Sequence, residues 1–320
     1  MSKTGDDNRA YAAAHFGMEL DGTKQIGMFR SVEGGGVKAD VMTYHHSINK
    51  ESGYGRYRQL GRPKFDDIKL QVGMSMSQPF YEWLRDFFDG KPTRKNGAIL
   101  AGDFQYKERA RRNFSNAMIK ELTFPKLEGQ DKNPAYMNVA LAVEDVQYQP
   151  GTGDDLAEAG DQNAQRLWTA CNFRLSLDNF EGTRRCTKID PFTIKQNIIE
   201  YHAGGFKTTQ KLPTVVEFPN IVFYIPEADG EPFIKHMQKR VGFGSSGNGE
   251  VRDPNAIHGQ IDVFDTDEKK NVVFTLEFYG ADVVSVTPDK SDADSNEAKM
   301  VKVEIYTEKM TFNYPVLELE

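Results

Sequence analysis

One stretch of the chain fits the spacing of a dinucleotide-binding loop. It is Gly242-Phe-Gly244-Ser-Ser-Gly247, which matches G-x-G-x-x-G. Such a loop binds a pyrophosphate when it follows a strand and opens a helix. Here the glycines follow a predicted helix and run into a second turn signal, Asn248-Gly249. A mobile glycine loop is therefore favoured over a nucleotide site.

Other side chains with chemical potential are scattered. His45-His46 has no Cys, His or acidic partner at a metal-ligand spacing, so an exposed pair is favoured. Cys171 and Cys186 are too few for a zinc site or a disulfide framework. The chain contains no HExxH, no P-loop and no G-x-S-x-G motif. We therefore expect no enzyme, no cofactor and no metal.

A short basic run raises the question of nucleic-acid binding. Arg109, Arg111 and Arg112 follow the aromatic residues Phe104 and Tyr106. Basic and aromatic residues together can bind nucleic acid, but this run is short and its half of the chain is only slightly basic. A solvated hairpin is the favoured interpretation.

The composition is that of a globular protein. The chain has 320 residues, 40 Lys+Arg against 47 Asp+Glu, 11% aromatic residues and a mean hydropathy of −0.60. It contains no apolar run long enough to span a membrane, and the first residues lack the apolar core of a secretory signal. The low cysteine count favours folding in a reducing cytoplasm.

The charge divides the chain into two halves. Residues 1–150 hold 22 basic and 19 acidic residues, whereas residues 151–320 hold 18 and 28. The stretch 151–166 is rich in Gly, Ala and Asp and poor in large apolar residues. Such a composition favours a linker. We therefore expect a first domain at 1–150, an acidic linker at 151–166 and a second domain at 167–320.

Signals recur in the same order in both halves. The alternating stretch Ile68–Val72 matches Ile221–Ile225, and Pro79-Phe80 matches Pro232-Phe233, both at an offset of 153. Phe114-Ser-Asn-Ala117 matches Phe278-Tyr-Gly-Ala281 at an offset of 164. The added residues fall in a longer loop after the second helix. Shared order at fixed offsets indicates a tandem duplication.

Each half contains many short alternating stretches and one helical pattern. This predicts a mainly β protein built from two tandem β-sandwich or barrel domains, each with one short α-helix. Each helix starts at a Pro-Phe pair, and its apolar side chains recur at helical spacing. The residues expected to pack on a sheet are Phe80, Trp83, Leu84 and Phe87 in the first helix and Phe233, Ile234 and Met237 in the second.

A segment between two predicted strands, His45–Arg62, is rich in Tyr, Arg and Gly. Tyr and Arg are frequent in protein–protein contacts. A hairpin of this composition could become ordered against a neighbouring subunit, and a solvated loop is an equally good interpretation of the composition. The candidate contact residues are Tyr44, Tyr54, Arg56, Tyr57, Arg58 and Arg62.

A set of motifs in residues 11–149 resembles the tail tube proteins of contractile phages and contractile injection systems. These motifs are Phe16-x-Met-Glu-Leu-Asp-Gly22, Phe29-x-Ser-Val-Glu-Gly-Gly35, Gly61-x-Pro-Lys-Phe-Asp-Asp-Ile-Lys-Leu70, Phe80-Tyr-Glu-Trp-Leu84, Arg94-Lys-Asn-Gly-Ala-Ile99, Phe114-Ser-Asn-Ala117 and Phe124-Pro-Lys-Leu127. The second half resembles the same unit more distantly.

The resemblance implies a structural subunit that forms hexameric rings stacked around a lumen. Residues 43–63 would reach toward an adjacent subunit or ring. The implied partners are other copies of the chain, sheath, baseplate or tail-terminator proteins, and DNA or protein cargo in the lumen. The implied location is a virion tail or injection particle assembled in the bacterial host cytoplasm, without membrane insertion.

The duplication sharpens this expectation. If one chain supplies two tube units, three chains form a pseudo-hexameric ring of six units. One alternative is a tube initiator or adaptor ring at the baseplate or tube end. An alternative of another class is a monomeric β-sandwich ligand-binding module.

Overall fold

The computed structural model describes residues 15–47, 54–74, 76–156, 168–204, 208–242, 257–266, 271–288 and 298–314. The first half contains β1 (His15–Leu20), β2 (Thr23–Gly34), β3 (Val37–Ser47), β4 (Tyr54–Phe65), β5 (Ile68–Val72), α1 (Gln78–Phe88), β6 (Lys95–Gly102), β7 (Glu108–Phe124), β8 (Leu127–Glu128), β9 (Met137–Ala142) and β10 (Asp145–Pro150). The second half contains β11 (Trp168–Leu177), β12 (Lys188–Ile189), β13 (Phe192–Tyr201), β14 (Gln210–Glu217), β15 (Ile221–Pro226), α2 (Glu231–Val241), β16 (Gly259–Asp265), β17 (Val272–Tyr279), β18 (Asp282–Pro288), β19 (Met300–Tyr306) and β20 (Lys309–Asn313). Over these residues the fold is mainly β with one α-helix in each half, which confirms the expected class.

In the part of the chain that the structure describes, the strands form three larger sheets and one separate hairpin. The largest sheet has the order β14-β13-β7-β6-β1-β2-β5-β9, and β10 also pairs with β7. Its last strand, β9, pairs with β7 as well as with β5. The other sheets are β11-β16-β17-β20 and β18-β19-β15-β12-β8. Two of the sheets therefore contain strands from both halves of the chain.

The repeat seen in the sequence extends to the backbone. The starts of β5 and β15, and those of α1 and α2, are each related by the offset of 153. Asn116 and Gly280, related by the offset of 164, both have a left-handed backbone, with φ of 51° and 62°.

The bulges of the two halves match as well. The β7–β9 pairing shifts register between Ile119 and Glu121. The β18–β19 pairing shifts at the equivalent place, between Val283 and Ser285, which is again the offset of 164. Matching bulges are features of one fold built twice.

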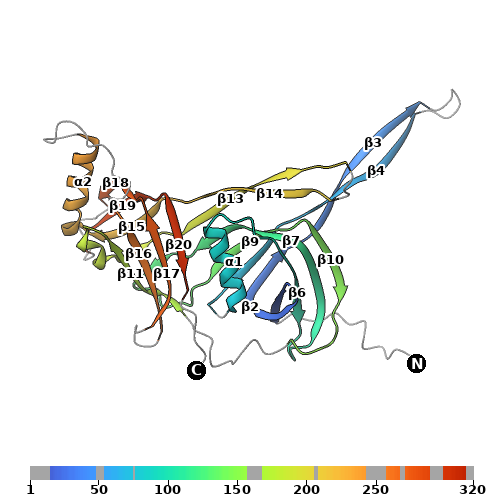
Figure 1. Ribbon diagram of the computed structural model, residues 1–320, viewed down its shortest axis with the longest axis horizontal. Coiled ribbons are helices and arrows are strands. Elements are labelled where there is room, and N and C mark those ends of the chain that lie inside the picture. Colours follow the sequence, from blue (N-terminus) through green and yellow to red (C-terminus); the bar gives the residue numbers. More distant parts are fainter. Residues whose placement is uncertain are drawn as a thin grey trace.

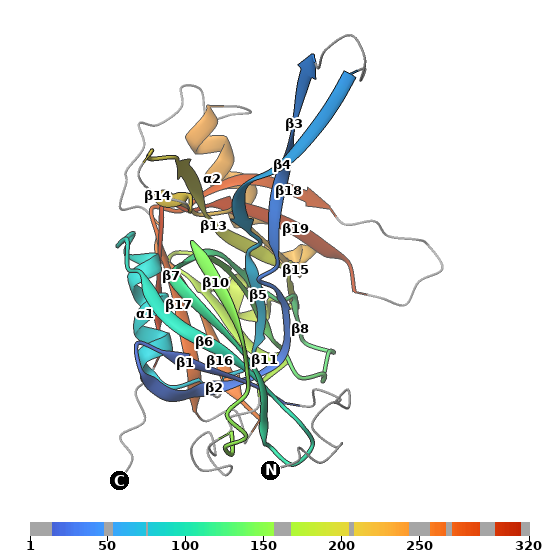
Figure 2. The same cartoon turned by 90° about the vertical axis from the view of Figure 1, so that its right-hand side faces the viewer.

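Each half also extends one long hairpin from its body. The first arm, defined here as β3–β4, pairs only with itself within the described residues and projects away from the sheets (Figures 1 and 2). The second arm, β13–β14, lies against the first half instead (Figure 1). Register shifts between Ala39 and Val41 and between Gln196 and Ile198 identify β3 and β13 as equivalent strands, at an offset of 157.

The core of the first half packs around α1. Proline in the first turn of α1 starts the helix without losing a needed hydrogen-bond donor. The predicted packing residues Phe80, Trp83, Leu84 and Phe87 are all buried in the core.

Helix α2 packs less completely. Phe233 is buried and Met237 packs against the core, but Ile234 is 43% exposed. The expectation that Ile234 packs on a sheet is therefore corrected, because the side of α2 that carries Ile234 and Val241 is exposed.

The first residues of the predicted linker lie against the first half. The backbone N–H of Leu156 donates to the carbonyl of Tyr106, and the Leu156 side chain packs with Ala98 and Leu100. Residues 157–166 lie outside the described residues. Neither described helix is long and apolar enough to span a membrane.

Candidate assembly surfaces

The first arm carries the predicted contact residues. Tyr44 of β3 lies directly opposite Tyr57 of β4, and both side chains are about half exposed. Arg56 and Arg58 follow on β4 and are exposed, and Tyr54 is the first residue of that strand. Arg62 is also exposed, but it donates a 3.4 Å hydrogen bond to the Ala203 carbonyl of the second half. The arm therefore presents tyrosine and arginine side chains to its surroundings. Whether a subunit binds them remains a prediction.

The second arm pairs with a strand of the other half of the chain. Residues Phe192–Lys195 of β13 pair antiparallel with Phe124–Glu121 of β7. The Phe192 and Phe124 rings stack with their centroids 5.0 Å apart. Ile194 lies opposite Leu122, and both side chains are fully buried. One half of the chain thus extends a strand onto the sheet of the other half.

Polar contacts fix the second arm along the first half. The backbone N–H of Lys211 donates to Glu144 at 2.7 Å, and Arg94 donates to the Lys211 carbonyl at 2.8 Å. The Asp67 carboxylate lies 2.7 Å from the Lys120 ammonium and 3.5 Å from that of Lys211. The hydrogen bond to Asp67 raises the pKa of Lys120. Because these contacts include backbone groups of β14, they hold the arm in one register.

A second contact between the halves joins α1 to β20, which lie side by side in Figure 1. The Tyr81 ring stacks on Tyr314 with centroids 3.7 Å apart, and Phe88 stacks on Phe312 at 5.8 Å. Aromatic pairs of this kind contribute strongly to burial. The junction between the halves therefore has two parts, a strand pairing and an aromatic helix–strand contact.

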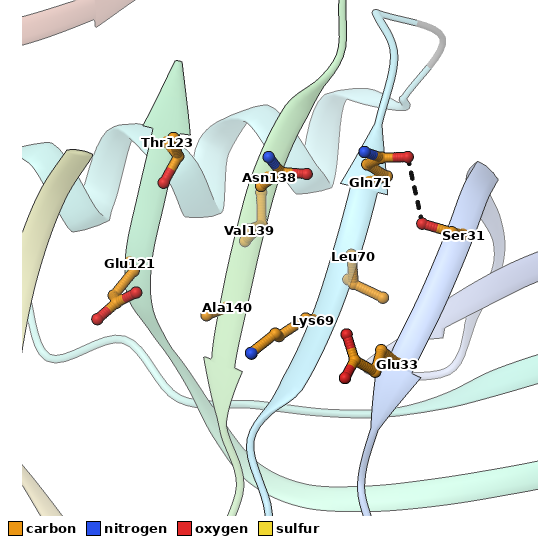
Figure 3. Close-up of a pocket in the computed structure, with 10 residues that line it drawn as sticks. All are labelled: Ser31, Glu33, Lys69, Leu70, Gln71, Glu121, Thr123, Asn138, Val139 and Ala140. Atoms are coloured by element: carbon orange, nitrogen blue, oxygen red, sulfur yellow. Dashed lines mark hydrogen bonds between the residues drawn. The ribbon is translucent and has the colours of Figure 1, made fainter. Parts of the chain in front are cut away.

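One face of the large sheet is polar and open. Alternating side chains of β2, β5, β9 and β7 line a shallow hollow of about 360 Å³ (Figure 3). Its polar lining residues are Ser31, Glu33, Lys69, Gln71, Glu121, Thr123 and Asn138. Ser31 donates a 3.3 Å hydrogen bond to Gln71. The hollow mixes both charge signs and lacks the apolar lining typical of a small-molecule site.

Among the described residues, those considered for chemistry do not assemble into a reactive site. His45 is exposed on the first arm, and residues 243–247 lie outside the described residues. In the described part of the chain, no three His, Cys, Asp or Glu side chains group closely enough to bind a metal ion. Burial raises the pKa of the Cys186 thiol to about 12. A thiol held protonated in this way is a poor nucleophile.

The basic run near Arg111 is not a solvated hairpin throughout. Arg111 is partly buried and forms ion pairs with Glu19 at 2.7 Å and Glu108 at 2.9 Å. Arg112 donates to the Gly34 carbonyl, and Arg109 pairs with Asp103. These arginines are engaged within the protein, because acidic and carbonyl groups of neighbouring strands and turns lie beside them.

Sequence reasoning missed that β13–β14 is the equivalent of β3–β4. A usable signal was present, because Tyr44-His45 recurs as Tyr201-His202 at the offset of 157. Tyr44 pairs with Tyr57, and Tyr201 pairs with Gln210. Between these paired residues the first arm is four residues longer than the second. The offset therefore falls from 157 between β3 and β13 to 153 between β4 and β14.

The fold and the junction between the halves define a class of protein: a duplicated β unit whose two copies join by strand pairing. The family of T4-like virus tail tube protein gp19 matches the chain twice, over residues 12–147 and 169–311. The chain belongs to this tail tube family, and its role is that of a structural tube-type component. The comparison with curated proteins gave no match.

Components of contractile injection systems are among the solved structures to which the chain is similar. A chain of an extracellular contractile injection system, in the PVC sheath–tube complex in the extended state, is 17% identical over 45% of this chain and 89% of its own, with a TM-score of 0.33. A chain of the anti-feeding prophage tube-terminating cap is 16% identical over 50% of this chain and 99% of its own, with a TM-score of 0.35. A chain of the anti-feeding prophage baseplate is 13% identical, over 45% and 93%, with a TM-score of 0.31.

Proposed function

We propose that three copies of this chain form a ring of six tube units, and that such rings stack around a lumen in a phage tail or contractile injection system. The ring assembles in the host cytoplasm and works with sheath, baseplate or tail-terminator proteins. Its function is assembly and passage of DNA or protein cargo, not catalysis.

The junction between the two halves carries this proposal. The second arm adds a strand to β7 of the first half, and the aromatic contact of α1 with β20 reinforces it. The two halves are versions of one unit, so the same join can be made again between chains. A repeated rotation closes a ring, which satisfies exposed strand edges. Two units per chain then require three chains for six units.

The polar face of the β2-β5-β9-β7 sheet is our candidate for the lumen wall. Its residues alternate with buried side chains such as Leu70 and Val139, so one face of the sheet is committed to the core. The other face presents Glu33, Lys69 and Glu121 to solvent. With two acidic residues and one basic residue, the wall has only a small net charge and would bind passing cargo weakly.

Electron microscopy and mass photometry of the purified protein test the proposal. We expect rings with a mass of three chains and, at higher concentration, stacked tubes. Single rings that never stack would instead indicate an initiator or adaptor. A particle of one chain at every concentration would overturn the ring and favour the monomeric binding module.

A further inference from the structure

The surfaces that join one chain to the next can be inferred from the junction inside the chain, and this inference rests on the ring proposed above. Within the chain, β13 occupies the edge of β7. The equivalent of this part of β7 in the second half is β18, which pairs only with β19 in the described part of the chain. The equivalent of β13 in the first half is β3, which likewise has no partner strand there except β4.

The internal offsets give the register of the missing pairing. Subtracting 157 from Ile194 gives Val37, and adding 164 to Leu122 gives Val286. We propose that Gly35–Lys38 of one chain pair antiparallel with Pro288–Ser285 of a second copy, with Val37 opposite Val286 and Lys38 opposite Ser285. The bulges that fix both offsets lie directly beside these segments.

Burial supports this assignment. Ile194 is fully buried against β7, whereas its equivalent Val37 is 57% exposed. Burial of a β-branched side chain by a neighbouring strand stabilises the pairing of the two strands. Val284, beside the proposed pairing on β18, is also exposed.

The contact between α1 and β20 provides a second argument for the surfaces that join two chains. Tyr81 and Phe88 of α1 are buried and stack on Phe312 of β20. Their equivalents in α2, at the offset of 153, are Ile234 and Val241. Both of these are exposed, at 43% and 68%. This explains why Ile234 does not pack on its own sheet, because its place is at the junction with the next chain.

The surface that α2 would meet follows from the same offsets. Phe312 of β20 stacks on Phe88. Its equivalent in the first half, at the offset of 164, is Tyr148 of β10. Phe312 is buried, whereas Tyr148 is 59% exposed. The join between chains therefore uses the β18 edge and α2 of one copy, and the start of β3 and Tyr148 of the next.

Disulfide trapping tests the register directly. Side chains directly opposite each other in antiparallel strands come close enough for a disulfide. The variant Lys38→Cys/Ser285→Cys should, on mild oxidation, give covalent species of two and three chains and none larger. The control variant Ala39→Cys/Ser285→Cys places the first thiol on the opposite face of β3 and should give about tenfold less crosslinking. Wild type reports the background from Cys171 and Cys186.

A second pair of variants tests the helix contact without relying on crosslinks. Ile234→Glu/Val241→Glu should prevent ring formation while leaving the circular dichroism spectrum and the thermal unfolding midpoint close to wild type. Phe104→Glu introduces the same type of charge at a 74% exposed position outside both surfaces, and rings should persist.

The outcomes separate the two proposals. Rings of three chains without the Lys38–Ser285 crosslink, or with equal crosslinking of the control pair, would overturn the register while the ring stands. Three-chain rings that survive both glutamates would overturn the α2 contact. Absence of rings in wild type, together with absence of crosslinks, would overturn both the surfaces and the proposed function.

Discussion

Phe192 of the second half stacks on Phe124 of the first half, with ring centroids 5.0 Å apart, at the strand pairing that joins the two repeats. Both side chains belong to the continuous apolar core that spans the chain. The duplicated halves are therefore packed together through this contact.

We expect Phe192→Ala to lower the free energy of unfolding by about 3–5 kcal/mol, because it leaves a cavity beside Phe124. Urea unfolding followed by tryptophan fluorescence measures this loss. The control is Ile199→Ala on the same strand, where the side chain is 57% exposed and the change should stay within about 0.5 kcal/mol. Equal effects of the two substitutions would show that the junction is not packed as described.

Asp282 holds α2 on β18 through contacts with His236 at 2.7 Å and Arg240 at 2.9 Å. Burial alone would raise the pKa of Asp282, but the hydrogen bonds from His236 and Arg240 outweigh burial and lower the pKa below the usual value of an aspartate. Because the folded-state pKa is the lower one, the stabilisation is present at neutral pH and is lost as the pH falls through the folded-state value.

Asp282→Asn should therefore cost about 1–3 kcal/mol at neutral pH. The difference in unfolding free energy between wild type and variant should shrink as the pH falls below the usual pKa of an aspartate, because the lowered pKa of Asp282 is then approached. Urea titrations at a series of pH values give this difference. A difference in unfolding free energy that grows on acidification would contradict this assignment of Asp282.

Gly34 lies where β2 ends and the chain turns toward the first arm, with φ of +88°. A Cβ at this position would overlap the carbonyl oxygen of Asp67. Gly22 has a similar φ of +81°, but a Cβ added there would meet no atom within 4 Å, so Gly22→Ala isolates the backbone strain.

We expect Gly22→Ala to cost about 1 kcal/mol of unfolding free energy and Gly34→Ala at least about twice that. Thermal unfolding of the two variants side by side provides the measurement. Equal losses would mean that the chain relaxes around residue 34 without cost.

Cys186 should resist alkylation in the folded protein. Burial raises the pKa of its thiol to about 12, and its Sγ atom donates to the Lys188 carbonyl at 3.3 Å. Since the thiolate is the reactive form, iodoacetamide should label Cys186 at least about a hundredfold more slowly in the folded protein than in urea. Peptide mass spectrometry follows the labelling, and rapid modification of the folded chain would show that the site opens readily.

The repeated unit and its family can be predicted from the sequence alone. The offset of 153 that relates the Pro-Phe pairs also relates Ile68–Val72 to Ile221–Ile225. These are local signals, because strand and helix periodicity follow from which side chains must be buried. Helical spacing likewise predicts which side chains of α1 face the core.

The way in which the two halves meet is visible only in the folded structure. Strand pairing depends on backbone groups that carry no side-chain signature, so nothing local marks β13 as a partner of β7. Ile234 shows the same limit, because helical spacing predicts an apolar face but not whether its partner lies in the same chain. The long-range pairing of edges, not the composition of any one segment, determines which surfaces remain open.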